Sequence, residues 1–236
     1  MLGIAFTTHN RHDLIADSLA AVERYTEDYV AVVVDDGSRQ PVTVPEGVKL
    51  VRHSEPRGIP AAKNRCIAEL MDLGVEHLFL FDDDTRPQAS DWWRPYAEGD
   101  ELYYTYCWTH FARDNTPVAK MDVLYRDSTL IAYAWSMGCC QYVHRDVIER
   151  VGGLDPVFGL GFEEHAEWAQ RIHNAGFTTF AHQDHPGVKG KIWAGDEHYA
   201  VQRSFDGLRG REALIERNTR LRLERAESTE FIDYRA

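Results

Sequence analysis

Short apolar runs alternate with amphipathic stretches over the first third of the chain. The apolar runs predict buried strands at residues 3–8, 29–34, 48–52 and 77–81. Residues 12–25 place Leu14, Ile15, Leu19 and Val22 on one face of a helix. A second helix is predicted at 59–74, with Pro60 in its first turn and Gly74 just past its end. Strands separated by helices predict a parallel sheet that is covered on both faces.

Beyond residue 100 the apolar runs follow one another closely, with short polar links between them. They predict antiparallel or mixed strands added to the sheet, at residues 101–108, 118–125 and 129–135. Helices are predicted at 144–150, before Gly152 and Gly153, and at 163–175, before Gly176. After residues 177–182 the chain becomes polar and loop-like. From about Gly210 onward the charges alternate in sign, which favours a surface helix or a helix that binds a partner.

Length and composition favour one α/β domain. The 236 residues, 44% of them hydrophobic, can bury a full core, and no repeat, linker or low-complexity tract divides them. We therefore expect a single domain over 1–236, with one half at 1–100, a second at 101–205 and a charged, helical tail at 206–236.

The charge and the termini restrict the partners and the location. A formal net charge of -12 argues against binding to nucleic acid. The four cysteines form no Cys-x-x-Cys pair, and we interpret them as reduced thiols. The N-terminus lacks the basic and apolar regions of a secretion signal, and no apolar run approaches the roughly 20 residues that span a bilayer. These features predict a cytoplasmic protein without an integral membrane segment.

Polar clusters follow three of the predicted strands. They occupy residues 7–11, 35–38 and 82–86. In an open α/β sheet, ligands gather beyond the carboxyl ends of the strands, so the three clusters are candidates for one site. Taken singly, the "DDGS" of 35–38 is better explained as a turn, because Asp, Gly and Ser are common turn residues.

The third cluster begins with three consecutive aspartates directly after a buried strand. Adjacent carboxylates there repel one another and lose hydration unless a cation or hydrogen-bond donors compensate. In an extended segment Asp82 and Asp84 point to the same side, where they can meet one divalent ion, or one ion and a ribose. Hard oxygen ligands suit Mg²⁺ or Mn²⁺, which bridge the oxygens of a diphosphate.

Two other enzyme classes place carboxylates after a strand. A phosphatase of the haloacid dehalogenase type needs Asp-x-Asp-x-Thr or Val on its first strand, whereas here the corresponding residue is Arg86 and the strand is the fourth. A Walker B strand requires a partner G-x-x-x-x-G-K-[ST] loop, which the sequence lacks. Neither motif is complete.

A second group of ionisable residues opens the predicted helix at 163–175. Acidic side chains are favoured there by the helix dipole. Glu164, Glu167 and Arg171 share one face of this helix. On its own, the group is better explained by an acidic first turn and a surface pair between Glu167 and Arg171, four residues apart.

Taken together, these motifs resemble the GT-A-fold glycosyltransferases, most closely the family 2 type that uses nucleotide-diphospho-sugars. The likeness runs from residue 3 to about residue 185. It rests on "GIAFTTHNR", "VVVDDGS", "RGIPAAKNRCI", the D-x-D-like "FLFDDDTRP", and "VGGLDP" with "EEHAEWAQR". The resemblance implies a single GT-A, Rossmann-like domain, with a nucleotide-sugar-binding half at 1–100 and an acceptor-side half at 101–205.

The resemblance also implies roles for individual residues. Asp84 would bind the metal, Mn²⁺ or Mg²⁺, and Asp82 and Asp83 would touch the ribose or the diphosphate. The other residues implied in nucleotide-sugar binding are Thr7, His9, Arg11, Asp36, Arg57, Lys63 and Asn64.

The catalytic base and the third metal ligand stay open. The family's catalytic aspartate corresponds to His165, with Glu164 just before it, and either side chain can accept a proton from an acceptor hydroxyl. We favour Glu164 slightly, with His165 beside it to orient the base or the acceptor. For the third ligand the resemblance implies His185 first and His182 second. The histidines expected only at the surface or at caps are His12, His53, His77, His110 and His144.

The leading hypothesis is a metal-dependent glycosyltransferase that moves a sugar, with inversion, from a nucleotide-diphospho-sugar to an acceptor hydroxyl. A UDP-sugar is the favoured donor, and a saccharide, a small molecule or a protein side chain the acceptor. The alternatives are a metal-dependent phosphatase or nucleotide-sugar hydrolase and, third, a non-catalytic sugar-binding protein.

Overall fold

A six-stranded sheet forms the centre of the computed structural model, which describes residues 1–107, 110–111, 117–119, 122–198 and 208–236, without the side chains of 110–111 and 117–119. The strands lie in the order β3-β2-β1-β4-β11-β6. Their bounds are Leu2–Thr8 for β1, Tyr29–Asp35 for β2, Val48–Arg52 for β3, His77–Asp82 for β4, Tyr103–Thr105 for β6 and Cys140–His144 for β11. Strands β1 to β4 are parallel, and β11 runs antiparallel to both β4 and β6. The expected mostly parallel sheet with an antiparallel extension is confirmed.

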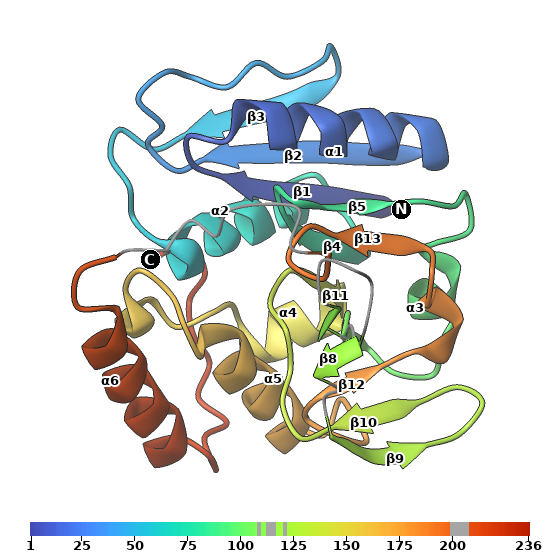
Figure 1. The fold of residues 1–236 in the computed structure, drawn as a ribbon, viewed down its shortest axis with the longest axis vertical. Coiled ribbons are helices and arrows are strands. Elements are labelled where there is room, and N and C mark those ends of the chain that lie inside the picture. Colours follow the sequence, from blue (N-terminus) through green and yellow to red (C-terminus); the bar gives the residue numbers. More distant parts are fainter. Residues whose placement is uncertain (108–109, 112–116, 120–121, 199–207) are drawn as a thin grey trace.

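Helices cover both faces of this sheet (Figure 1). The helices are α1 (His12–Tyr25), α2 (Ile59–Asp72), α3 (Arg94–Ala97), α4 (Arg145–Val151), α5 (Glu164–Asn174) and α6 (Arg211–Glu224). Apolar side chains of α1 and α3 pack in one core with one face of the sheet, and those of α2, α4 and α5 pack in a second core with the other face. The alternation of strands and helices therefore produces two buried layers, as the sequence pattern predicts.

The smaller strands form three further sheets. Their orders are β12-β10-β9, β13-β5 and β7-β8. The bounds are Thr85–Pro87 for β5, His110–Phe111 for β7, Pro117–Ala119 for β8, Val123–Arg126 for β9, Ile131–Tyr133 for β10, Gln183–Asp184 for β12 and Ile192–Ala194 for β13. Two short 3₁₀ turns, η1 (Pro156–Phe158) and η2 (Pro186–Val188), lie in loops. The strands predicted at 101–108 and 129–135 form only in part, and part of the one predicted at 118–125 lies outside the described residues.

Strand β11 has no counterpart among the strands predicted from the pattern. Its sequence, Cys-Gln-Tyr-Val-His, has no strong alternation and runs directly into α4. The polar Gln141 is nevertheless fully buried, because its amide donates to Tyr103 Oη at 2.8 Å. Tertiary contacts rather than local propensity create this strand.

The charged tail forms helix α6, which docks on the chain itself. Asn218 is buried and donates to the carbonyls of Phe158, Gly161 and Phe162 at 2.6–3.0 Å. The chain then returns to α4, where Gly153 N donates to Ile232 O at 2.9 Å. None of the helices in the described ranges is long and apolar enough to cross a membrane.

Candidate active site

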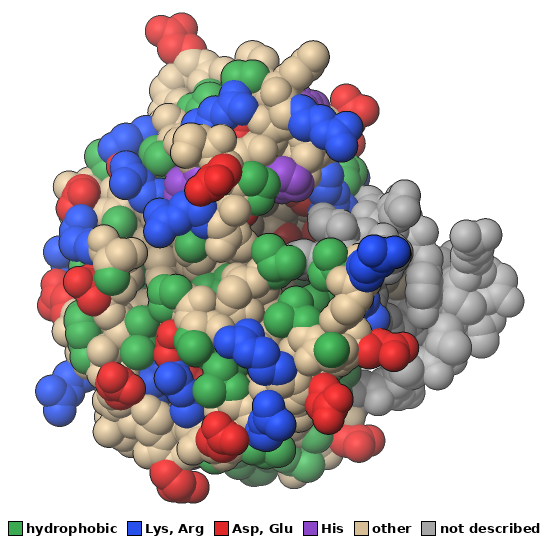
Figure 2. Space-filling view, turned by 90° about the vertical axis from the view of Figure 1, so that its left-hand side faces the viewer, with side chains coloured by type: hydrophobic (Ala, Val, Ile, Leu, Met, Phe, Trp, Pro, Cys, Tyr) green, Lys and Arg blue, Asp and Glu red, His purple; other side chains and the backbone are tan. Residues whose placement is uncertain are grey.

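A cleft of about 560 Å³ opens at the carboxyl ends of β1, β2 and β4. It is also bordered by the first residues of α2, α5 and α6. Figure 2 shows this side of the molecule, with acidic side chains visible inside a hollow. Of the residues predicted for the site, those that line the cleft are Thr7, His9, Arg11, Asp36, Lys63, Asp82, Asp83, Asp84, Glu164 and His165.

Arg11 holds two carboxylates of the aspartate triplet. Its Nη1 lies 2.7 Å from Asp83 Oδ1, and its Nη2 lies 2.7 Å from Asp84 Oδ2. Thr8 Oγ1 donates to the other oxygen of Asp83 at 2.7 Å. Burial raises the pKa of Asp83 to about 7, although Arg11 and Thr8 oppose the shift. From the sequence we expected a cation or hydrogen-bond donors to compensate these charges and favoured a divalent metal, whereas part of the compensation comes from Arg11.

Lys63 holds the third carboxylate from the opposite side. This buried side chain lies 3.1 Å from Asp82 Oδ1, donates to Gly138 O and lies 3.4 Å from Gln141 Oε1. Burial alone would lower the pKa of Lys63, but the charges of Asp82 and Glu164 outweigh it and raise the pKa. Because its three donors all have partners, Lys63 acts as a buried counter-ion and tie between α2 and the loop before β11.

The carboxylate of Asp36 fixes the loop that leads into α2. It accepts from Arg57 N and Gly58 N, both at 2.9 Å, and its Oδ1 lies 2.7 Å from His53 Nδ1. Gly58 has φ +92°, and a Cβ there would collide with Gly159 O. The glycine thus allows this tight turn at the cleft. We expected His53 at the surface or at a cap, whereas its side chain is only 9% exposed and lies beside the carboxylate of Asp36.

Glu164 and His165 form a coupled pair at the start of α5. His165 Nδ1 lies 3.3 Å from Glu164 Oε1, and its Nε2 lies 3.1 Å from Ser136 O. Both partners are acceptors, so both ring nitrogens must carry hydrogen, as in the imidazolium. Burial opposes the charge, yet the bond to Glu164 outweighs it and raises the pKa of His165. The pKa of Glu164 is lowered, because His165 and Lys63 outweigh burial.

The second oxygen of this carboxylate differs from the first. Glu164 Oε2 is buried and has no hydrogen-bond partner among the described residues. An unpaired buried carboxylate oxygen is costly unless a ligand completes it. Glu164 lines the cleft, so this unpaired Oε2 belongs to an ionised carboxylate in the cleft wall.

Helix α5 is held in place by a buried ion pair. Arg171 Nε lies 2.8 Å from Glu167 Oε1, and both side chains are at most 2% exposed. The guanidinium also donates to Val151 O at 2.9 Å and Gly153 O at 2.7 Å. The expected pair between residues 167 and 171 is present, but the expectation that it is an exposed one is wrong. Its burial makes it an anchor for the helix that carries Glu164.

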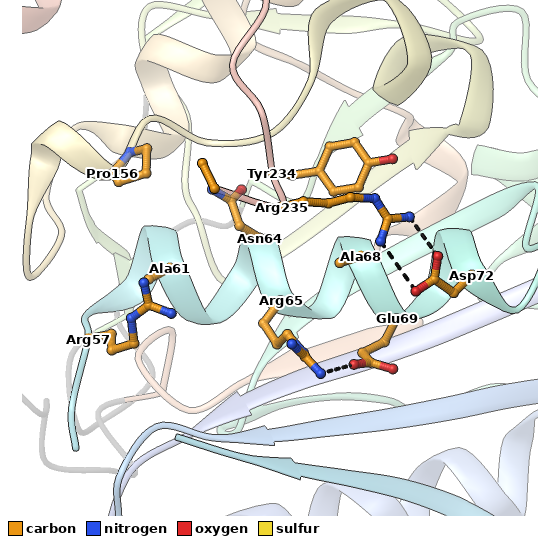
Figure 3. Close-up of a pocket in the computed structure, with 11 residues that line it drawn as sticks. Arg57, Ala61, Asn64, Arg65, Ala68, Glu69, Asp72, Pro156, Tyr234 and Arg235 are labelled. Carbon is orange, nitrogen blue, oxygen red and sulfur yellow. Dashed lines mark hydrogen bonds and ion pairs between the residues drawn. The ribbon is translucent and has the colours of Figure 1, made fainter. Parts of the chain in front are cut away.

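Asn64 and the side chain of Arg57 lie elsewhere, in a second cavity of about 280 Å³ between α2 and the C-terminus. Figure 3 shows this cavity, where Arg235 also pairs with Asp72. Asn64 Nδ2 donates to Leu154 O at 2.7 Å, and its Oδ1 accepts from Leu154 N at 2.8 Å. The nitrogen and the oxygen of the Asn64 side-chain amide are thus both bonded to the backbone of Leu154. This corrects the expectation that Asn64 binds the sugar or the diphosphate.

Replacing Asn64 with alanine is expected to lower the free energy of unfolding by about 1–3 kcal/mol, because Leu154 N–H and C=O lose buried partners. Urea unfolding checks this value. Asn64→Asp is the matched control, since it keeps the acceptor for Leu154 N and should cost less. Binding of a nucleotide sugar should stay unchanged in both variants at a temperature where they are folded, and weakened binding would return Asn64 to the site.

The two histidines expected as third metal ligands do not line the cleft. His185 Nδ1 accepts from Gly187 N at 2.9 Å, and its ring packs edge-on against Tyr104. Burial and the nearby His165 lower the pKa of His182 to about 4. Within the described part of the chain, no three His, Cys, Asp or Glu side chains gather closely enough to hold a metal. Neither histidine therefore lines the cleft that Asp84 lines.

The remaining histidines are partly as expected. His144 caps α4 by accepting from Asp146 N, and His12 lies near Gln40 O at 3.1 Å. His77 Nδ1 lies 3.0 Å from Tyr142 Oη. The side chain of His110 lies outside the described residues.

Several cleft residues escaped the sequence analysis. Asp196 reaches the cleft because β13 pairs with β5, which places Gly195 N 2.8 Å from Asp84 O. Trp135 and Phe162 add aromatic surface, and Arg211 enters from the start of α6. The sequence gives no sign of Asp196, because it follows a short apolar run of three residues, Ile192–Ala194, and a glycine, rather than a long buried strand.

The strand order and the helical layers on both faces of the sheet are those of the GT-A fold. Two solved structures of that fold are similar to this chain. One is the mannosyltransferase PcManGT from Pyrobaculum calidifontis in complex with GDP-Man and Mn²⁺, with a TM-score of 0.51 and 20% identity over 75% of this chain. The other is GalNAc-T7 with UDP, GalNAc and Mn²⁺, with a TM-score of 0.56 and 13% identity over 75% of this chain.

The match is one of fold. The aligned part spans 52% of the mannosyltransferase structure and 41% of the GalNAc-T7 structure, so this chain covers about half or less of their length. No family model matches the sequence, and no curated protein matches it either.

Proposed function

We propose that the chain is a metal-dependent glycosyltransferase that moves a sugar from a nucleotide-diphospho-sugar to an acceptor hydroxyl, with inversion. One observation carries the proposal: the carboxylate of Asp84 and the ionised Glu164 line the same cleft, together with Lys63, which interacts with both Asp82 and Glu164. The first carboxylate suits a metal-bound diphosphate and the second suits an acceptor. The fold supports this assignment, because both similar structures are of glycosyltransferases with nucleotide ligands and Mn²⁺.

The oxygen ligands in the cleft fit a divalent metal that a donor completes. Asp84 and Asp196 both line the cleft, beside the β5–β13 pairing. Mg²⁺ and Mn²⁺ are commonly held by one or two carboxylates together with substrate phosphates, so a cage of three protein ligands is unnecessary. When bound, such an ion neutralises the charge that develops on the leaving diphosphate. Asp84 and Asp196 are the residues that we propose hold it.

The donor would lie along the ends of β1 and β2. Thr7 and His9 line the cleft there, and His9 Nδ1 lies 2.7 Å from Asp36 O. We keep a UDP-sugar as the favoured donor, although one of the two similar structures holds GDP-Man. The carboxylate of Asp36 already binds the backbone of the loop at Arg57 and Gly58. We therefore assign Asp36 to shaping the nucleotide pocket.

Glu164 is the proposed base. Oε2 of its ionised carboxylate has no hydrogen-bond partner among the described residues. The charged ring of His165, by contrast, uses both nitrogens, one for Glu164 Oε1 and one for Ser136 O. The acceptor oxygen attacks the anomeric carbon as its proton passes to Glu164 Oε2. The bond from that carbon to the diphosphate oxygen breaks on the opposite face, and the nucleoside diphosphate leaves. His165 orients Glu164 and keeps it ionised.

The acceptor end of the cleft is largely apolar. Trp135 is 47% exposed and Leu160 is 41% exposed, and both line the cleft near Glu164. An exposed tryptophan offers a flat apolar face with a polar N–H, which suits a sugar ring as a partner. Among the expected acceptors, this surface favours a saccharide.

A thermal-shift panel of UDP-, GDP-, CDP- and dTDP-sugars, with and without Mn²⁺, tests the function. Ligands that bind only the native state raise its apparent stability, by about 2.7 kcal/mol at 100 times Kd. One nucleotide class should raise the Tm with Mn²⁺ and much less without it. The absence of any shift, or metal-dependent release of phosphate from generic esters, would overturn the proposal, and the second result would support the phosphatase alternative.

A further inference from the structure

Arg11 binds Asp84, one of the two carboxylates to which the proposed function assigns the metal. Its guanidinium spans two neighbouring side chains, Asp83 and Asp84, with one nitrogen 2.7 Å from each. The three side chains are 17%, 4% and 11% exposed. A planar fork that matches two carboxylates in a sheltered position is a strong ion-pair arrangement. A side-chain cation therefore lies beside Asp84.

A metal and Arg11 compete for the same charge. A cation that binds Asp84 weakens the bond from Asp84 Oδ2 to Arg11, which leaves a sheltered guanidinium without a full partner. Breaking one side of a buried ion pair is costly. Binding of a free metal ion at this site therefore carries the free-energy cost of opening the ion pair, which weakens its affinity.

A nucleoside diphosphate offsets this cost of metal binding. Arg11 itself lines the cleft, so a diphosphate bound beside Asp84 offers its guanidinium a new anionic partner. The same diphosphate supplies oxygen ligands to the metal. The cost of opening the pair is then offset by two interactions that only the ligand provides.

We propose that Arg11 is a latch on Asp83 and Asp84 that makes metal binding depend on the nucleoside diphosphate, so that the two bind as a unit. The latch rests on the proposed function, since it concerns the metal of that site. It also gives Arg11 two roles, one with the carboxylates in the ligand-free protein and one with the donor diphosphate. Asp83, held by Arg11 and Thr8, serves to position the latch.

The test is Mn²⁺ binding measured by electron paramagnetic resonance, with no nucleotide and with UDP or GDP. The proteins are the full chain, Arg11→Met, which has a similar length and no charge, and the matched control Arg86→Met. Arg86 lies two residues from Asp84 but contacts Trp193 and Asp17. It therefore reports the general effect of removing one positive charge near the site.

Without nucleotide, Arg11→Met is expected to bind Mn²⁺ about tenfold more tightly than the unaltered chain, and Arg86→Met less than about twofold more tightly. The factor by which UDP or GDP tightens Mn²⁺ binding should fall by about tenfold in Arg11→Met alone. Equal Mn²⁺ affinities in Arg11→Met and Arg86→Met without nucleotide, with unchanged coupling, would overturn the latch.

Two further results separate the latch from the function beneath it. If none of the proteins binds Mn²⁺ even with UDP or GDP, the proposed metal site fails and the latch fails with it. If Arg11→Met does not fold, Arg11→Lys gives the same test, because a lysine cannot span both carboxylates. Without nucleotide, Arg11→Lys should bind Mn²⁺ more tightly than the unaltered chain, but by less than the tenfold expected for Arg11→Met. An unchanged affinity would contradict the latch.

Discussion

Replacing Asp84 with asparagine is expected to lower kcat for sugar transfer by about a thousandfold. Asparagine keeps the size of the side chain but removes the charge that holds the metal against the leaving diphosphate. A metal ion contributes several kcal/mol of transition-state stabilisation, and each 1.36 kcal/mol corresponds to about tenfold in rate. The measurement is release of nucleoside diphosphate at saturating donor, acceptor and Mn²⁺.

The matched control for this variant is Asp91→Asn. Asp91 is an exposed aspartate that pairs with Lys191 at 2.6 Å, outside the cleft. It should leave kcat within about twofold, as expected for a surface substitution. An Asp84→Asn protein that transfers sugar at the unaltered rate with Mn²⁺ would remove Asp84 from the metal site.

The metal dependence should change together with the rate. Arg11 would still bind Asp83 in Asp84→Asn, so the site keeps a cation but loses its charged oxygen ligand. We therefore expect the Mn²⁺-dependent part of the thermal shift by the nucleotide sugar to be lost. A variant that loses the rate but keeps this shift would assign Asp84 to the chemistry and Asp196 to the metal.

The sequence predicts the sheet and the strand-end residues well, because each depends on local pattern. The four predicted strands appear as β1 to β4, although the edge strand β3 is largely exposed, and parallel strands bring their carboxyl ends to one edge. Thr7, Asp36 and Asp84 are thereby placed at one cleft without any knowledge of side-chain contacts. Helix α5 begins at Glu164, where the acidic cluster predicts a start.

The sequence could not reveal which groups neutralise the carboxylates. Arg11 and Asp83 are 72 residues apart, and Lys63 and Gly138 are 75 residues apart, so their meeting depends on the tertiary packing of α1 and α2. Asp196 likewise enters through the pairing of β13 with β5. Pairwise contacts of this kind leave no periodicity in the chain.

The choice of base illustrates the same limit. The sequence favours Glu164 only slightly over His165, because both side chains can accept a proton. Only the position of Ser136 O, which occupies the second nitrogen of His165, shows that the ring is charged and that the carboxylate is the free partner. The decision depends on a backbone carbonyl 29 residues away in the chain.

Replacing Glu164 with glutamine is therefore expected to lower kcat by about a thousandfold, within the range of about 10²–10⁴ for loss of a general base. Donor binding should be unchanged in the thermal-shift assay, because Glu164 faces the acceptor end. The matched control is Glu163→Gln, in which the neighbouring residue loses its pairing with Arg222 outside the cleft. Full activity in Glu164→Gln would exclude this carboxylate as the base.

The pH dependence of kcat/KM separates the two candidates further. A base must be deprotonated, so activity is present above its pKa in the folded protein and is lost as the pH falls through that pKa. The pKa of Glu164 is lowered by His165 and Lys63 despite burial, which places the acidic limb below the usual value of about 4.3 for glutamate. If His165 were the base, its raised pKa would place that limb above about 6.5.

In His165→Gln, Glu164 loses the partner that lowers its pKa, so the acidic limb should move to higher pH while activity is retained at high pH. Complete loss of activity in His165→Gln at every pH, with donor binding intact, would instead identify the imidazole as the base.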